Sequence, residues 1–165
     1  MLEAISSHYK VRKLTVKDVD QIYKLSSGNP IFYQYCPPFV TRESILQDLE
    51  ALPPRVTRDS KYYVGFWESE KLVAILDLIL RYPDQETAFV GLFMMDQSKQ
   101  GRGIGSNIIS EICSCLHREG YTCVRLAYVK GNGQSKMFWL KNQFEPTGEE
   151  YSNETYTAVV LQRLL

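Results

Sequence analysis

The segment that most constrains this chain is a strand-like run followed by a glycine-rich loop and an amphipathic helix. Residues Thr87–Met95 are rich in β-forming side chains, and the loop Gln100–Gly105 contains three glycines. Apolar residues then recur at helical spacing as far as Gly120, namely Ile104, Ile108, Ile109, Ile112 and Leu116. The first turn of such a helix has free N–H groups and a positive dipole end, and glycines let its backbone approach a ligand closely. The segment therefore predicts a phosphate or pyrophosphate site, with Arg102 as an added charged donor.

Two common nucleotide-binding loops do not fit this pattern. A P-loop requires Gly-Lys-Ser or Gly-Lys-Thr after its second glycine, and the sequence has no such run. A dinucleotide-binding loop follows the first strand of a parallel βαβ unit, whereas this loop follows three strands that are expected to be antiparallel. An ordinary glycine-rich turn without a ligand remains an alternative for the loop taken alone.

The other elements follow from hydrophobic periodicity and from helix-capping and turn residues. The expected strands are Val11–Leu14, Lys61–Trp67, Lys71–Leu80, Thr87–Met95, Thr122–Tyr128, Phe144–Glu150 and Thr155–Gln162, and the expected helices begin at Thr15, Thr41, Ile104 and Asn132. The order β-α-α-β-β-β-α-β-α-β-β predicts one α/β domain over residues 1–165. Its central sheet is expected to be mixed, mainly antiparallel and flanked by helices.

Composition narrows the classes of function. The chain has 165 residues with 19 basic and 19 acidic side chains, so it has no overall field for nucleic acid or an anionic membrane. The four cysteines are too scattered for a disulfide framework, and two histidines leave no recognisable zinc set. The N-terminus lacks the apolar core of a signal peptide, and no apolar run could span a bilayer. We therefore expect a cytoplasmic protein with no metal and no nucleic-acid or membrane partner.

In the context of the whole chain the loop indicates a family. The pattern Gln100-x-x-Gly103-x-Gly105 resembles the Q/R-x-x-G-x-G/A loop of the GNAT family of N-acetyltransferases. The element order also matches that fold, and Asn132 opens a helix one strand after the loop, as in the family. The resemblance implies an enzyme that uses acetyl-CoA (coenzyme A) to acetylate a primary amine of a small molecule or peptide, as a monomer or homodimer. A non-catalytic acyl-CoA-binding sensor or adaptor is the alternative.

The resemblance also implies cofactor-binding residues. Backbone groups of the strand before the loop would contact the pantetheine arm, and amides of the loop and first helical turn would hold the pyrophosphate. The helix opened by Asn132 would line the other side of the cofactor, although for Phe138 and Lys141 a purely structural role is the alternative. The implied residues are Phe93, Met94, Met95, Gln100, Gly101, Arg102, Gly103, Ile104, Gly105, Ser106, Asn132, Ser135, Phe138 and Lys141.

The residues that would handle charge and protons depart from the family pattern. The resemblance provides a donor to the thioester carbonyl, the backbone N–H of Phe93. Where members often carry an acidic tyrosine and a basic glutamate, this chain has Trp139 and Phe89, which exchange no proton near neutral pH. Asp77 interrupts an apolar strand and is a candidate base if burial raises its pKa, or a solvated residue on the strand's outer face. Tyr128 is a candidate acid.

An aromatic stretch between the first two expected helices is the candidate acceptor site. Residues Ile31–Phe39 include Phe32, Tyr33 and Tyr35, whose rings would favour an apolar or cationic amine. A core plug beneath a long loop is the alternative. The sequence alone does not identify the acceptor.

Overall fold

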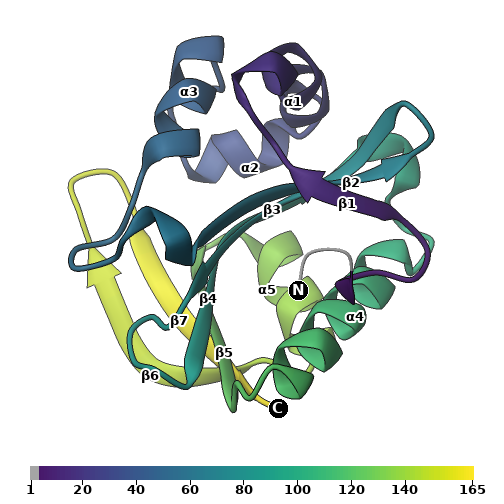
Figure 1. The fold of residues 1–165 in the computed structure, drawn as a ribbon. Helices are drawn as coiled ribbons and strands as arrows, with labels where there is room; N and C mark the ends of the chain where they lie inside the picture. The colour runs from purple at the N-terminus through teal and green to yellow at the C-terminus, as the bar shows by residue number, and fades with distance from the viewer. Residues whose placement is uncertain (1–3) are drawn as a thin grey trace.

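The structure is a computed structural model that describes residues 4–165. Within these residues, seven strands form one sheet (Figure 1). The strands are β1 (Lys10–Lys13), β2 (Lys61–Glu68), β3 (Lys71–Leu80), β4 (Thr87–Met95), β5 (Cys123–Val129), β6 (Glu145–Ser152) and β7 (Thr157–Leu164). Their order across the sheet is β1-β2-β3-β4-β5-β7-β6. Only the β4–β5 pair is parallel among these strands, so the expected mixed, mainly antiparallel sheet is confirmed.

Helices cover both faces of this sheet (Figure 1). One face carries α1 (Val19–Ser27), α2 (Pro30–Tyr35) and α3 (Arg42–Glu50), and the other carries α4 (Ile104–Arg118) and α5 (Gly133–Lys141). Ile22 and Ile45 pack with Ile75 of β3 in the core under α1 and α3. Ile108 of α4 packs with Leu76 of β3 in the larger core on the opposite face. Alternate residues of β3 therefore enter different cores, as the two-residue repeat of a strand requires.

One helix was not predicted. The stretch Ile31–Phe39 was expected to be a loop, but its first half forms α2, so the element order contains one more helix than expected. Pro30 occupies the first turn, where its missing N–H costs nothing, and the N–H of Cys36 closes the helix on the carbonyl of Phe32 at 3.0 Å. A helix this short shows no periodicity in the sequence. The other elements were predicted to within a few residues.

Cysteine burial, membrane-spanning helices and metal-binding clusters can each be checked in the structure. Cys113 and Cys115 are buried residues of α4, whereas Cys36 and Cys123 are half-buried. No helix within residues 4–165 is long and apolar enough to cross a membrane. Over the same residues, no three His, Cys, Asp or Glu side chains gather in a way that could hold a metal ion.

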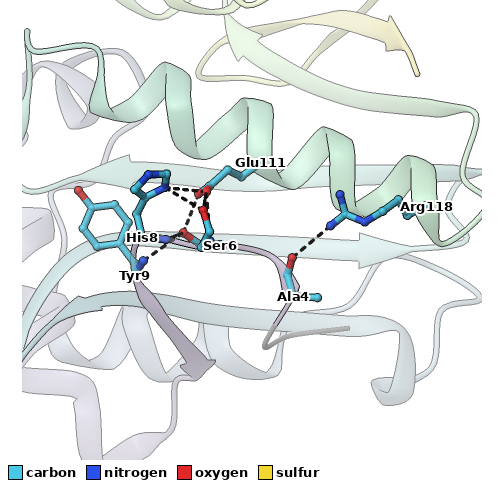
Figure 2. Close-up of polar contacts among 7 residues, drawn as sticks. Ala4, Ser6, His8, Tyr9, Glu111 and Arg118 are labelled. Atoms are coloured by element: carbon cyan, nitrogen blue, oxygen red, sulfur yellow. Dashed lines mark hydrogen bonds and ion pairs between the residues drawn. The ribbon is translucent and has the colours of Figure 1, made fainter.

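A carboxylate on α4 holds the segment before β1. Figure 2 shows Ser6 and His8 directed at Glu111 from that segment. Glu111 accepts hydrogen bonds from the hydroxyls of Ser6 at 2.6 Å and Ser7 at 2.7 Å, and His8 Nδ1 lies 2.8 Å from Glu111 Oε1. Partial burial alone would raise the pKa of Glu111, but these hydrogen bonds lower it to about 2.

We expect Glu111→Gln to lower the free energy of unfolding by an amount that depends on pH. Because the pKa falls from 4.5 to about 2 on folding, the stabilisation is complete above about pH 4.5 and is lost as the pH falls toward 2. Solvent reaches this site, so we expect a loss of only about 1–2 kcal/mol in the free energy of unfolding at pH 7. Urea unfolding at pH 7 and at pH 3 measures it. The exposed Glu119→Gln is the control, and an equal effect of Glu111→Gln at both pH values would contradict the prediction.

Candidate active site

Strand β4 carries an irregularity where it leaves β5. The two strands pair only as far as Val90 and Leu126. The register between β4 and β3 shifts between Asp77 and Leu78, which leaves Gly91 as an extra residue in β4. Such a β-bulge bends the strand locally. The second half of β4 therefore follows β3 alone, and a gap opens beside β5.

The backbone of that second half presents hydrogen-bonding groups to the gap. The N–H of Asp96 donates to the carbonyl of Val73 on the β3 side at 2.8 Å. Successive residues direct their backbone N–H and C=O groups to alternate edges of a strand. The backbone groups of Met94 therefore also face β3, whereas those of Phe93 and Met95 face the gap. The amide of Phe93 is thus open to a ligand. The expected backbone contact from Met94 is not available, because those groups belong to the ladder with β3.

The glycine loop forms a cradle of backbone donors at the start of α4. Gly101 and Gly103 have φ values of 74° and 77°, a region that side chains disfavour. Gly103 precedes the helix without a side-chain cap, so the N–H groups of residues 104–106 lack helical partners. A Cβ on Gly103 would meet nothing within 4 Å, whereas one on Gly105 would lie 2.7 Å from Met95 Sδ. The loop is therefore open on its outer side and closely packed on its inner side.

A cavity of about 460 Å³ connects the loop to the second half of β4 and to α2. The predicted residues that line it are Phe32, Phe93, Met94, Met95, Gln100, Gly101, Gly103, Gly105, Ser106, Asn132, Ser135, Phe138 and Lys141. The predicted residues outside its lining are Tyr33, Asp77, Arg102, Ile104, Tyr35 and Tyr128. An open cradle of backbone N–H groups and a gap that exposes strand amides fit the pyrophosphate and the amide-containing arm of coenzyme A.

Aromatic rings line one wall of this cavity. Asn132 caps α5 by accepting the N–H of Ser135 at 3.1 Å, which sets the start of the helix. Phe138 then stacks on Phe93 with ring centroids 5.9 Å apart, and the ring of Trp139 lies edge-on to Phe138 at 5.0 Å. Trp139 is buried and lines the cavity. Its position provides an N–H donor but no acid.

Asp77 forms a largely buried ion pair with Lys61. Its carboxylate oxygens lie 2.9 and 2.8 Å from Lys61 Nζ, and the two side chains are 16% and 7% exposed. Burial raises the pKa of Asp77, and the hydrogen bonds from Lys61 limit the rise. The alternative of a solvated Asp77 is wrong, because Asp77 shares a face of β3 with Ile75, and α1 and α3 cover that face. A Cβ on Gly91 would lie 3.1 Å from Asp77 Oδ2, so the carboxylate lies beside the bulge in β4.

The second candidate for proton transfer lies elsewhere. Tyr128 on β5 is half-buried and packs against the core under α4, on the opposite face of the sheet from Asp77. Phe89, at the position where relatives can carry a glutamate, packs edge-on against Tyr82 at 5.6 Å. The structure therefore does not bring Asp77 and Tyr128 together on one face.

The aromatic residues of α2 have different surroundings. Phe32 lines the cavity. The ring of Tyr33 lies 4.9 Å from Phe32 and 5.2 Å from Phe39, and a Cβ on Gly131 would lie 3.5 Å from the ring of Tyr35. Of the three predicted acceptor residues, only Phe32 faces the cavity.

Several lining residues were missed in the sequence. They are Gly28, Asn29, Pro30, Gln97, Gln134 and Trp139, whereas Ile31 belongs to the predicted acceptor stretch and also lines the cavity. Asn29 accepts a hydrogen bond from Gln100 Nε2 at 2.7 Å, although the sequence places it only in a helix-breaking turn. No local pattern signals this contact.

Solved structures of similar fold are acetyltransferases. An acetyltransferase from Thermus thermophilus has 20% identity and a TM-score of 0.75, covering 94% of this chain and 96% of its own. An acetyl transferase from Salmonella typhimurium has 16% identity and a TM-score of 0.76, covering 98% and 97%. The PaiA N-acetyltransferase from Thermoplasma acidophilum, in complex with coenzyme A, has 14% identity and a TM-score of 0.67, covering 94% and 98%.

Family assignment rests on sequence. No curated protein sequence matches the chain. The model of the acetyltransferase (GNAT) family matches residues 20–144, which include the loop, the bulged strand and the start of α5. The chain therefore belongs to the GNAT family and is an acetyltransferase that uses acetyl-CoA.

Proposed function

We propose that this enzyme acetylates a primary amine of a small molecule or peptide by direct attack of the amine on the thioester. The observation that carries the proposal is the open amide of Phe93, beside a cavity that extends from the glycine loop to α2. The Salmonella relative modifies the N-terminal serine of a 50S ribosomal subunit protein, which supports a peptide amine as one class of acceptor.

The residues of the chain would divide the chemistry as follows. Bound acetyl-CoA supplies an activated acetyl thioester. The N–H of Phe93 would donate to the thioester carbonyl oxygen and stabilise the negative charge that develops there. Asp77 would accept a proton from the amine through water, because its carboxylate does not line the cavity. As the N–C bond forms and the C–S bond breaks, the thiolate of coenzyme A would leave and take up, through water, the proton that the amine loses. Trp139 would donate a hydrogen bond to the departing sulfur without giving up its own proton.

An acceptor screen tests this proposal. The protein is incubated with acetyl-CoA and a panel of small primary amines and short peptides with free N-termini, while the free thiol of coenzyme A is followed. We expect thiol release that depends on one class of acceptor. Coenzyme A binding by calorimetry without acceptor-dependent release across the panel would contradict the proposal and favour the non-catalytic alternative.

A further inference from the structure

Helix α2 has little intrinsic stability. It spans only Pro30–Tyr35, and none of its residues is buried. Isolated helices shorter than about 12 residues are marginal in water, so contacts with the rest of the protein must keep α2 ordered. Phe32 and Tyr33 pack against the core under α1 and α3, and hydrogen bonds hold the two ends of the helix. At its C-terminal end, Cys36 hydrogen-bonds to Tyr156 of the β6–β7 turn. At its N-terminal end the contacts come from Asn29.

Asn29 occupies the position that normally caps a helix, but its side chain does not cap α2. Its Nδ2 group donates to the carbonyl of Leu25 at 3.0 Å and to that of Met95 at 2.9 Å. Its Oδ1 accepts from Gln100 Nε2 at 2.7 Å, and Gln100 Nε2 also donates to Met95 at 3.1 Å. Because carbonyls can only accept, these partners fix the orientation of both side-chain amides.

These hydrogen bonds join the two sides of the cavity. Gln100 begins the loop that forms the anion cradle, and Met95 ends the strand that carries Phe93. Asn29 leads directly into α2, whose Phe32 lines the same cavity. Any ligand that orders the loop through Gln100 therefore also acts on the start of α2.

We propose that Asn29 is a positioning residue that couples cofactor binding at the glycine loop to the ordering of α2 on the acceptor side. The inference rests on the proposed function, since α2 is treated as part of the acceptor site. In physical terms, a loop held by a bound pyrophosphate fixes Gln100, Gln100 fixes Asn29, and Asn29 fixes the first turn of a marginal helix. Energetic coupling between sites in proteins is commonly about 5- to 150-fold.

Hydrogen exchange of the backbone amides tests the coupling in the full chain. We expect coenzyme A to slow exchange in the loop and also, by at least about fivefold, in α2. Adenosine 3′-phosphate 5′-diphosphate, which carries the pyrophosphate but no pantetheine arm, distinguishes coupling from direct contact. This fragment should protect α2 as well as the loop. Protection of the loop alone by the fragment would overturn the proposal.

The variant Asn29→Asp keeps the acceptor for Gln100 but replaces both donated hydrogen bonds with repulsion between oxygens. We expect it to retain protection of the loop by coenzyme A and to lose protection of α2. Gln34→Ala, an exposed change within α2, is the matched control and should retain both. Equal protection of α2 in Asn29→Asp and in the unsubstituted chain would overturn the proposal. If Asn29→Asp does not fold, the fragment measurement still decides.

The same data separate this inference from the proposed function. Absence of protection in the loop, together with no calorimetric binding of coenzyme A, would overturn both. Protection in the loop without protection in α2 would overturn the coupling alone.

Discussion

Replacing Gly103 with valine is expected to lower the affinity for coenzyme A by at least about 100-fold. A β-branched residue disfavours the φ of 77° that forms the cradle, so the loop would leave this conformation. If the conformation persisted, the new side chain would project into the open space where the pyrophosphate would bind. A 100-fold loss of affinity corresponds to about 2.8 kcal/mol. Backbone strain of about 1–3 kcal/mol at one residue can account for most or all of it. Isothermal titration calorimetry with coenzyme A measures the effect.

Gly120→Val is the matched control for backbone strain. Gly120 also has a positive φ, 93°, with nothing within 4 Å of a Cβ, but it lies at the far end of α4 and outside the cavity lining. We expect Gly120→Val to destabilise the fold and to leave coenzyme A affinity unchanged in the folded protein. Unchanged affinity in Gly103→Val would refute the cradle.

Asp77→Asn is expected to lower turnover by about 10²- to 10⁴-fold, if Asp77 is the base, while coenzyme A binding persists. Asparagine preserves the size of the side chain and removes its basicity. The loss should shrink at high pH, where more of the acceptor amine is already neutral. Steady-state rates across a pH series, with an acceptor found in the screen, measure both effects.

A structural role of Asp77 would also reduce activity, because the asparagine leaves the buried Lys61 without its ion-pair partner. The double variant Asp77→Asn/Lys61→Met removes that unpaired charge. If Asp77 acts only through Lys61, the double variant should recover turnover, whereas the loss of a base should remain. Full activity of Asp77→Asn would move the test to Tyr128→Phe. If that variant is also fully active, neither side chain carries the proton.

The features that sequence reasoning predicted are local in the chain. The glycine spacing, the apolar stripe of α4 and the cap at Asn132 each involve residues of one continuous segment, and the structure contains all three. The family follows from the loop together with the order of elements along the chain, and the family model matches residues 20–144. Local patterns suffice here because backbone geometry, rather than distant packing, decides them.

The missed features depend on residues that are distant in the sequence. Asn29 meets Met95 and Gln100 across separations of 66 and 71 residues, and no periodicity encodes such contacts. The environment of Asp77 depends on Lys61, 16 residues away, and on the helices that cover that face. Helix α2 was missed for a different reason, since it is too short to repeat a pattern.

The extra residue at Gly91 divides β4 into a half that packs in the core and a half that also lines the cavity. Before it, Ala88 and Val90 face the core under α4, and after it Phe93 and Met95 face the same side, so the alternation changes phase within β4. Substitutions at Ala88 and Val90 therefore affect only the core, whereas substitutions at Phe93 and Met95 affect both the core and the shape of the site. The shape of the site can therefore be changed without altering the half of β4 that pairs with both β3 and β5.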